Sequence, residues 1–433
     1  MRFWITPRAV AAALIGLLPI VLVPTWWMML ACLGALVVVV GVDALLAPDP
    51  RRIIPERRLA HQVRLGEDVA GTLLLTNPTS RRARLQVRDA WNPTAGLAAQ
   101  RAAVDLPAGE RRAIAQVYTP TRRGDHSSRG IIVAARGPLG LAQRSTTHRE
   151  PAGRLRALHS FSSRRHLPSR IQRLREIEGL AAVHQRGQGT EFDSLRDFVD
   201  GDDVRSIDWR ATARRRTVVV RTWRPERDRH VLIVVDTSRT AAARVGDAPR
   251  LDAALDAALL LTALATQAGD RVDLLCMDRI AHVSVSGSGR RTVLHDVVAA
   301  TAPVHPALVE TDWDRAAAQI RARARRGALV VLLTPVDSGA VQHGLEPVAA
   351  RIAADHPVIV ASVADPGLAA MARERGDLEA VYRAAAAERA RSEREGLAEA
   401  LRRDGAHVVD APPDVLPQAL ADEYLALKAA GRL

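Results

Sequence analysis

The sequence predicts an α/β protein whose C-terminal half forms a doubly wound parallel sheet, preceded by a small β-sandwich-like domain and a two-helix transmembrane hairpin. Apolar strands alternate with helices after residue 230, which is typical of a parallel sheet with helices on its faces. Short segments of period-two alternation fill residues 53–149, and residues 9–47 are almost wholly apolar. A chain of 433 residues is long enough for all three parts.

The apolar run from Ala9 to Ala47 carries one charged residue, Asp43. Because roughly 20 apolar residues span a bilayer as a helix, this run is long enough for two crossings. Pro24 and Thr25 interrupt it near the middle. We therefore predict a transmembrane hairpin within residues 1–52, with helices at about 9–23 and 26–46.

Arginines flank both ends of this hairpin, and the predicted turn between the helices has none. By the positive-inside rule, both ends then lie in the cytoplasm, so we expect a multi-pass membrane protein with cytoplasmic soluble domains. A cleaved signal peptide is the alternative. Against it, no small-residue cleavage site separates the first apolar stretch from the second.

The middle of the chain changes character. Alternating stretches such as Gly71–Asn77 and Gly130–Ala135 are separated by Gly, Pro, Asn and Asp, which favours a small antiparallel β-sandwich over residues 53–149. We find no catalytic constellation in this domain. Residues 150–186 are predicted to be an arginine-rich, partly helical connector.

The C-terminal part, residues 187–433, begins with a charged segment and continues as alternating strands and helices. We expect strands at 231–236, 272–277, 281–285, 328–334, 358–363 and 406–409, and helices at 251–268, 292–301, 313–326, 341–355 and 416–430. A long Ala, Arg and Glu-rich helical stretch, 368–403, lies between the last two strands. Its charges favour a solvated face over a site.

The formal charge of +13 does not indicate nucleic-acid binding. Lys428 is the only lysine, so the basic set is almost entirely arginine, and from Gln185 to His230 eleven arginines interleave with nine acidic residues. Aromatic residues make up 3% of the chain, which leaves few stacking platforms for single strands. A weak attraction to anionic lipid fits the charge better.

Asp236, Ser238 and Thr240 stand where the buried strand 231–235 ends and a loop begins. A carboxylate and two hydroxyls from such a loop can converge on one hard cation, Mg²⁺ or Mn²⁺. Sites in doubly wound sheets lie at the carboxyl ends of strands, where this triplet falls. The alternative is an ordinary turn in which the hydroxyls cap a helix or the aspartate forms an Asx turn.

The segment from Gly187 to Arg216 is dense in charged and special residues. Its acidic and basic side chains can form a charged network that fixes the segment against the α/β domain. These side chains are those of Asp202, Asp203, Arg205, Asp208 and Arg214. The alternative is a docking surface for a protein partner with Trp209 as its anchor, since Trp and Arg are enriched in binding hot spots.

An enzyme is the second class of hypothesis, because Asp202, Asp203 and Asp208 can hold two cations for phosphodiester hydrolysis. Arginines threaded between them and the lack of an HExxH motif oppose it. The Gly187-x-Gly189 pair is a weak phosphate-loop signal, and with no lysine nearby there is no Walker A sequence. We therefore expect no catalytic activity and no small-molecule substrate.

Residues 187–240 resemble the domain-of-unknown-function family 58 (DUF58), membrane-anchored bacterial proteins whose C-terminal part is similar to von Willebrand factor A (vWA) domains. The matching residues are Gly187, Gly189, Glu191, Phe192, Leu195, Arg196, Gly201, Asp202, Asp203, Arg205, Ile207, Asp208, Trp209, Thr212, Ala213 and Arg214, then Asp236 and Ser238. The resemblance implies a vWA-like fold and a place in the bacterial plasma membrane. Such proteins are typically encoded beside MoxR-type AAA+ ATPases, which implies a chaperone-like or assembly partnership.

The metal site of vWA-like domains carries over in part. Asp236 and Ser238 match it, Thr240 stands where a serine is usual, and Thr311 matches the distant threonine ligand. Pro335 fills the acidic position expected after strand 328–334, and Asp337 comes two residues late. The resemblance thus implies a membrane-tethered adaptor whose degenerate metal site, or a metal-free surface in its place, binds a protein partner.

Overall fold

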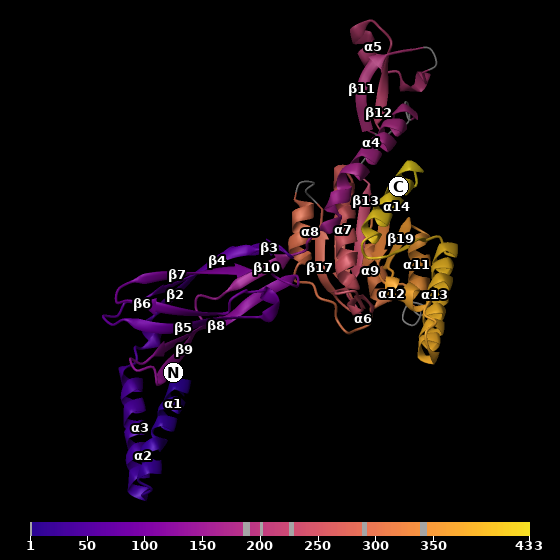
Figure 1. Ribbon diagram of the computed structural model, residues 1–433. Helices are drawn as coiled ribbons and strands as arrows, with labels where there is room; N and C mark the ends of the chain where they lie inside the picture. The colour runs from indigo at the N-terminus through magenta and orange to yellow at the C-terminus, as the bar shows by residue number, and fades with distance from the viewer. Residues whose placement is uncertain (1, 185–190, 200–201, 225–228, 288–291, 338–343) are drawn as a thin grey trace. The chain divides into compact units, whose positions relative to one another are not determined.

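The computed structural model describes residues 2–184, 191–199, 202–224, 229–287, 292–337 and 344–433 (Figure 1). The chain divides into two compact units, Met1–Ser160 and Phe161–Leu433. Each unit has buried hydrophobic clusters of its own.

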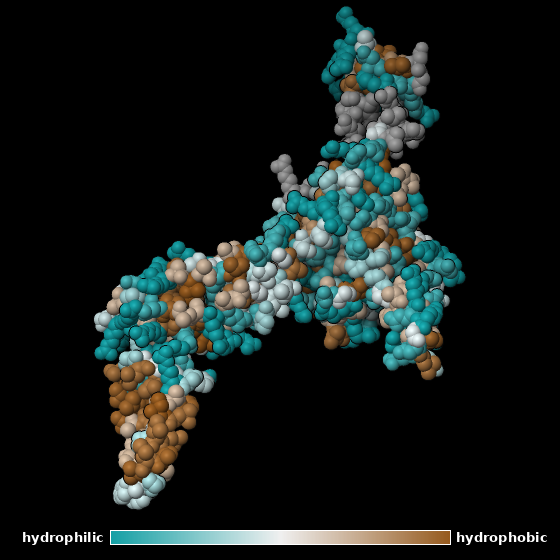
Figure 2. Space-filling view, in the orientation of Figure 1, coloured by the Kyte–Doolittle hydropathy of each residue, from teal (hydrophilic) through white to brown (hydrophobic). Residues whose placement is uncertain are grey.

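The first unit begins with a strand, β1 (Arg2–Ile5), followed by three apolar helices, α1 (Pro7–Ile15), α2 (Leu17–Leu22) and α3 (Trp26–Leu46). The helices α1 and α2 contact α3, and the face of these helices that Figure 2 shows is almost wholly apolar. In the part of the chain that the structure describes, one helix, Trp26–Arg52, is long and apolar enough to cross a membrane, with a mean hydropathy of 2.5. The helix Pro7–Leu22 is apolar but shorter.

The rest of this unit consists of two β-sheets. Their strands are β2 (Ile54–Leu59), β3 (Gln62–Arg64), β4 (Val69–Thr76), β5 (Ala83–Trp91), β6 (Arg101–Leu106), β7 (Arg111–Tyr118), β8 (Gly124–Arg136), β9 (Ala142–His148) and β10 (Arg154–Leu158). One sheet has the order β1-β9-β8-β10-β3, with β5 also paired to β8 and β6 to β5, and the other is β2-β4-β7. Strand β5 alternates buried and exposed residues, so one face of its sheet packs in the core and the other faces solvent.

The boundary predicted after residue 149 is wrong, because β10 pairs with β8 and β3 and so belongs to the β-domain. Leu155 and Ala157 of this strand are buried in the first unit. The described remainder of the predicted connector, from Phe161 on, belongs to the second unit. It contains α4 (Leu167–His184), which packs against α7 (Arg250–Gln267) and α14 (Leu416–Ala429) of the second unit.

Both ends of the apolar helical segment are fixed to one turn, between β8 and β9. Strand β1 pairs antiparallel with β9, and Thr6 Oγ1 donates a hydrogen bond of 2.6 Å to the carbonyl oxygen of Gly140. Near the other end of the segment, the Asp43 carboxylate is fully buried. It accepts hydrogen bonds from the backbone N–H groups of Leu139, Leu141 and Ala142 at 2.7, 2.7 and 2.8 Å. The helices therefore leave the β-domain and return to it at the same place.

The second unit contains a six-stranded sheet in the order β17-β16-β13-β18-β19-β20. Its strands are β13 (His230–Asp236), β16 (Arg271–Met277), β17 (Ala281–Ser286), β18 (Leu329–Leu333), β19 (Val358–Val363) and β20 (His407–Ala411). All neighbours pair in parallel except β17, which is antiparallel to β16. Further helices around this sheet are α6 (Arg239–Ala242), α8 (Val293–Thr301), α9 (Trp313–Arg323), α11 (Leu345–Ala353), α12 (Pro366–Met371) and α13 (Leu378–Arg403). A two-stranded hairpin, β14 (Arg244–Val245) with β15 (Ala248–Pro249), follows α6.

Helices cover both faces of this sheet, so its central strands are buried on both sides. On β13, Val231, Ile233 and Val235 join the core formed with α7 and α14, whereas Leu232 and Val234 join the core formed with α9 and α11. This double burial explains the uninterrupted apolar run that the sequence shows at this strand. The strand ends at Asp236, on the carboxyl edge of the sheet.

The described part of the charged segment before β13 contains two strands and a short helix. Strands β11 (Glu191–Asp197) and β12 (Val219–Arg224) pair antiparallel. A 3₁₀ turn (Val204–Ser206) and the short helix α5 (Trp209–Arg215) lie between them. We call residues 191–224 the signature hairpin.

Replacing Asp43 with Asn tests how the helices are held to the β-domain. The change removes a buried charge that satisfies three backbone donors, so we expect the contact to weaken by about 3 kcal/mol. Hydrogen exchange of residues 139–142 in the detergent-solubilised full chain should accelerate markedly. Asp49→Asn is the matched control, because the exposed contact of the Asp49 carboxylate is a single local one, with the Arg51 N–H, among the described residues. Equal protection in all three proteins would contradict this account.

Candidate functional site

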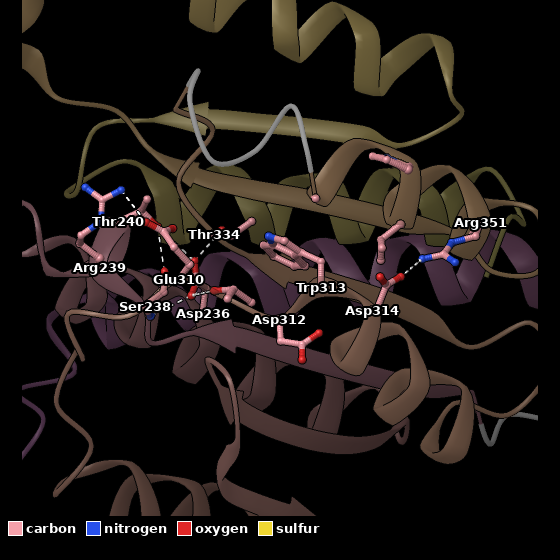
Figure 3. A pocket seen from close by; sticks show the side chains of 14 residues that line it. Asp236, Ser238, Arg239, Thr240, Glu310, Asp312, Trp313, Asp314, Thr334 and Arg351 are labelled. Carbon is pink, nitrogen blue, oxygen red and sulfur yellow. Dashed lines mark hydrogen bonds and ion pairs between the residues drawn. The ribbon is translucent and has the colours of Figure 1, made fainter.

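A cleft of about 840 Å³ opens at the carboxyl end of β13 and β18 (Figure 3). Four segments far apart in the sequence build it: the loop after β13, the start of α9, the residue that follows β18 and the start of α11. Its lining residues are Asp236, Ser238, Arg239, Thr240, Glu310, Thr311, Asp312, Trp313, Asp314, Thr334, Gly344, Pro347, Val348 and Arg351. The structure therefore brings together the four predicted ligands, including Thr311, which is 75 residues from Asp236.

The Asp236 carboxylate is the centre of this arrangement, and the residue is 4% exposed. Its Oδ1 atom accepts from Thr311 Oγ1 at 2.7 Å and from the Ser238 N–H at 2.8 Å. Its Oδ2 atom accepts from Thr334 Oγ1 at 2.8 Å and from Thr240 Oγ1 at 3.3 Å. Four donors thus fix the orientation of one carboxylate.

These hydroxyl groups can still bind a cation. A hydroxyl has one proton to donate and two lone pairs to offer. Thr240 and Thr311 donate to Asp236, and Ser238 Oγ lies 3.0 Å from Thr240 Oγ1, so their oxygen lone pairs remain for a hard cation such as Mg²⁺ or Mn²⁺. The donor set fits a cation that keeps several waters. A donor set with one carboxylate among its four predicted ligands would hold such a cation weakly.

Two other carboxylates near strand ends are engaged elsewhere. Asp337 pairs with Arg250 and, at 3.3 Å, with Arg394. It therefore does not replace the acidic ligand that was expected at the position of Pro335. Asp278, after β16, accepts from His282 Nε2 at 2.7 Å. Burial raises the Asp278 pKa, but the bond from His282 and backbone donors outweigh burial and lower it. Among the described residues, no three His, Cys, Asp or Glu side chains form a group that can hold a metal.

The rim of the cleft is charged and one wall is aromatic. Arg239 pairs with Glu310 at 2.6 Å, and Arg351 pairs with Asp314 at 2.6 Å. The Trp313 indole lies against Gly344, where an added Cβ would stand 2.4 Å from Trp313 Cδ1. Only glycine therefore lets α11 begin beside this ring.

Sequence reasoning missed Thr334, Trp313 and Gly344. Thr334 directly follows β18, so the rule that placed Asp236 at a strand end could have found it. No comparable signal in the sequence marks the contact between the indole and the glycine.

In the signature hairpin, the three predicted aspartates each have a separate local partner. Asp202 pairs with Arg196 and accepts from the Val199 N–H at 3.0 Å. The Arg196 hydrogen bond lowers the pKa of Asp202. Asp203 caps the 3₁₀ turn by accepting from the Arg205 N–H at 2.9 Å.

Asp208 caps α5. Its Oδ1 atom accepts from the N–H groups of Arg210 and Ala211, both at 3.0 Å, and its Oδ2 atom accepts from Arg221 Nε at 2.8 Å. The hydrogen bond from the Ala211 backbone, followed by that from Arg221, lowers the Asp208 pKa.

The single charged network predicted for this segment is therefore wrong. Within the described residues, the Arg205 and Arg214 side chains make no ion pair, and the pairing arginines are Arg196 and Arg221. Trp209 is 66% exposed at the start of α5. Gly189 lies outside the described residues, as do the side chains of Glu191 and Phe192 at the start of β11.

Asp208→Ala should loosen α5 in a pH-dependent way. Because the folded pKa of Asp208 lies below the ordinary value for aspartate, about 3.9, its contribution is present above that value and is lost as the pH falls below it. Hydrogen exchange of residues 205–216 should be faster in the variant than in the wild type at pH 7, and this difference should shrink at pH 3. Asp197→Ala, which removes an exposed acid from the same hairpin, should show neither effect. A difference independent of pH would contradict the assignment.

Comparisons with known proteins agree with part of this description. The uncharacterised proteins Rv1480 and MT1527 of Mycobacterium tuberculosis are each 31% identical over 182 residues, which are 42% of this chain and 56% of theirs. The chain thus matches about half the length of these relatives. A crystal structure of the hypothetical protein BatB from Bacteroides thetaiotaomicron overlaps 47% of this chain and 99% of its own, with 14% identity and a TM-score of 0.33, too low to bear on function. Residues 194–395 match the model of the family described as "Protein of unknown function DUF58", which supports the predicted relationship to that family.

Proposed function

We propose that this protein is a membrane-anchored adaptor whose vWA-like domain binds a protein partner through a divalent cation at Asp236. The observation that carries the proposal is the arrangement around that carboxylate. Thr240 and Thr311 donate protons to it, and Ser238 stands beside Thr240. Their oxygens can hold Mg²⁺ or Mn²⁺, and an acidic side chain of the partner would complete the coordination.

The sheet supports the vWA-like assignment. Five strands are parallel, the antiparallel strand β17 lies at one edge, and the cleft opens at the carboxyl end of the central strand β13. Ligand sites of doubly wound sheets lie at this edge.

We further propose that α1 and α2 cross the membrane together with α3, as a hairpin in a bacterial plasma membrane. The return of the chain to the β8–β9 turn supports this, because a single crossing would leave β1 and β9 on opposite sides of the bilayer. Arginines at both flanks favour cytoplasmic ends. The soluble domains are then in the cytoplasm.

The partner that we propose is a MoxR-type AAA+ ATPase, as the family resemblance implies. The cleft has features that suit a protein ligand, namely the Trp313 wall and the charged pairs at its rim. Exposed Trp209 on the signature hairpin offers a second contact. The separate partners of Asp202, Asp203 and Asp208 do not favour the rival hydrolase, so we do not propose it.

Cation binding is the first test. In the purified full-length protein, we expect weak Mn²⁺ binding, with a Kd of roughly 10⁻⁴–10⁻³ M by analogy with weak oxygen-ligand sites. Asp236→Asn and Thr311→Val should each weaken it about tenfold or more, measured as free Mn²⁺ by electron paramagnetic resonance. Asp247→Asn, which removes an exposed acid, is the control. Equal binding by all four proteins would refute a cation site here.

Partner capture is the second test. Full-length protein, Asp236→Ala and Trp209→Ala should each be used to recover partners from the native host, with and without chelator. We expect an AAA+ ATPase with the wild type and its loss upon chelation or with Asp236→Ala. Recovery that depends on Trp209 alone would place docking on the signature hairpin. If no ATPase is recovered with the wild type, the proposed partnership is wrong.

A further inference from the structure

The first unit contains a second groove, of about 700 Å³, on the outer face of its larger sheet. Four arginines line it, Arg2, Arg88, Arg101 and Arg149, and no acidic residue does. Trp4 and Gln143 are among the other lining residues. We call it the arginine groove.

Strand register places two of these arginines against each other. Arg88 on β5 is directly opposite Arg101 on β6. Like charges at such positions destabilise a sheet, because neighbouring strands are only about 4.8 Å apart. Elsewhere on the same pair of strands, Arg84 is opposite Asp105, which also pairs with Arg82 at 2.5 Å. Arg84 thus has an acidic residue opposite it on the neighbouring strand, whereas Arg88 has another arginine.

Within the part of the first unit that the structure describes, none of the four guanidinium groups makes an ion pair or a side-chain hydrogen bond. Other arginines of this domain are paired, for example Arg57 with Asp89 and Arg156 with Asp125, both at 2.6 Å. An anion bound in the groove would supply the missing countercharge, and phosphate geometry matches the arginine fork.

The groove lies beside the apolar helices. Arg2 and Trp4 belong to β1, and α1 begins two residues after that strand. Trp4 is 53% exposed and donates a hydrogen bond from Nε1 to Ser145 Oγ at 3.1 Å. A partly exposed indole next to a membrane-crossing segment is typical of the lipid headgroup region.

We propose that the arginine groove binds the phosphate groups of anionic phospholipids. This inference rests on the membrane insertion proposed above. In this proposal the β-domain binds the anionic membrane surface through Arg88 and Arg101. Arg2 and Trp4 line the end of the groove that is nearest the helices.

The test uses the full-length protein in detergent, titrated with dioctanoyl phosphatidylglycerol or dioctanoyl phosphatidylcholine and followed by native mass spectrometry. We expect the anionic lipid to bind at least tenfold more tightly. The double variant R88Q/R101Q should lose on the order of tenfold or more of that affinity, because each cation near an anionic surface contributes to binding. R81Q/R122Q removes two exposed arginines of the same domain that do not line the groove, and it should bind as the wild type does.

Three further readouts separate the possible outcomes. Flotation with neutral vesicles tests insertion alone, so its failure would refute the membrane anchor and the groove's role together. Normal insertion with equal lipid binding by R88Q/R101Q would refute the groove only. If millimolar inorganic phosphate competes as well as the lipid does, the groove binds a soluble anion and the proposal is overturned.

Arg101→Gln alone should be at least as heat-stable as the wild type in neutral lipid, since it relieves a repulsion. A large loss of stability would mean that Arg101 is structural.

Discussion

The candidate site depends on one interaction, the satisfaction of the buried Asp236 carboxylate at the end of β13. A buried charge is costly unless it is hydrogen-bonded, so the chain around Asp236 is tightly constrained. Thr311, before α9, and Thr334, after β18, each place a hydroxyl within 2.8 Å of it. The carboxylate thereby joins two neighbouring strands to the start of a helix. The cleft exists because these segments meet at that point.

Arginine has two different uses in this chain. Buried arginines hold elements together, as Arg394 does when it joins α13 to Asp410 on β20 and to Ser362 on β19. These pairs engage carboxylates that would otherwise be available to a ligand. Asp337 is the clearest case, because it follows Thr334 of the cleft by three residues but is held by Arg250 and Arg394. Arginines without a partner in the described part, those of the groove among them, are then the ones available for ligands.

Much of the α/β sheet could be predicted from the sequence, because strands such as β13 and β18 are buried on both faces and therefore carry uninterrupted apolar runs. The places of Asp236 and Thr334 at strand ends follow from the same logic. Strand β1 could not, because four residues before an apolar helix carry no periodic signal and pair with a strand about 140 residues away. The partners of Asp337 were equally hidden, since Arg250 on α7 is 87 residues and Arg394 on α13 is 57 residues away in the sequence.

Asp43 and Asp236 show why one buried aspartate is structural and the other can be functional. Asp43 accepts from three backbone N–H groups, which have no lone pairs to offer a cation. Asp236 accepts mainly from hydroxyls, each with an oxygen that can face both the carboxylate and the cleft. The same requirement, a buried charge that must be hydrogen-bonded, therefore fixes the helices to the β-domain in one unit and gathers three hydroxyl groups around one carboxylate in the other.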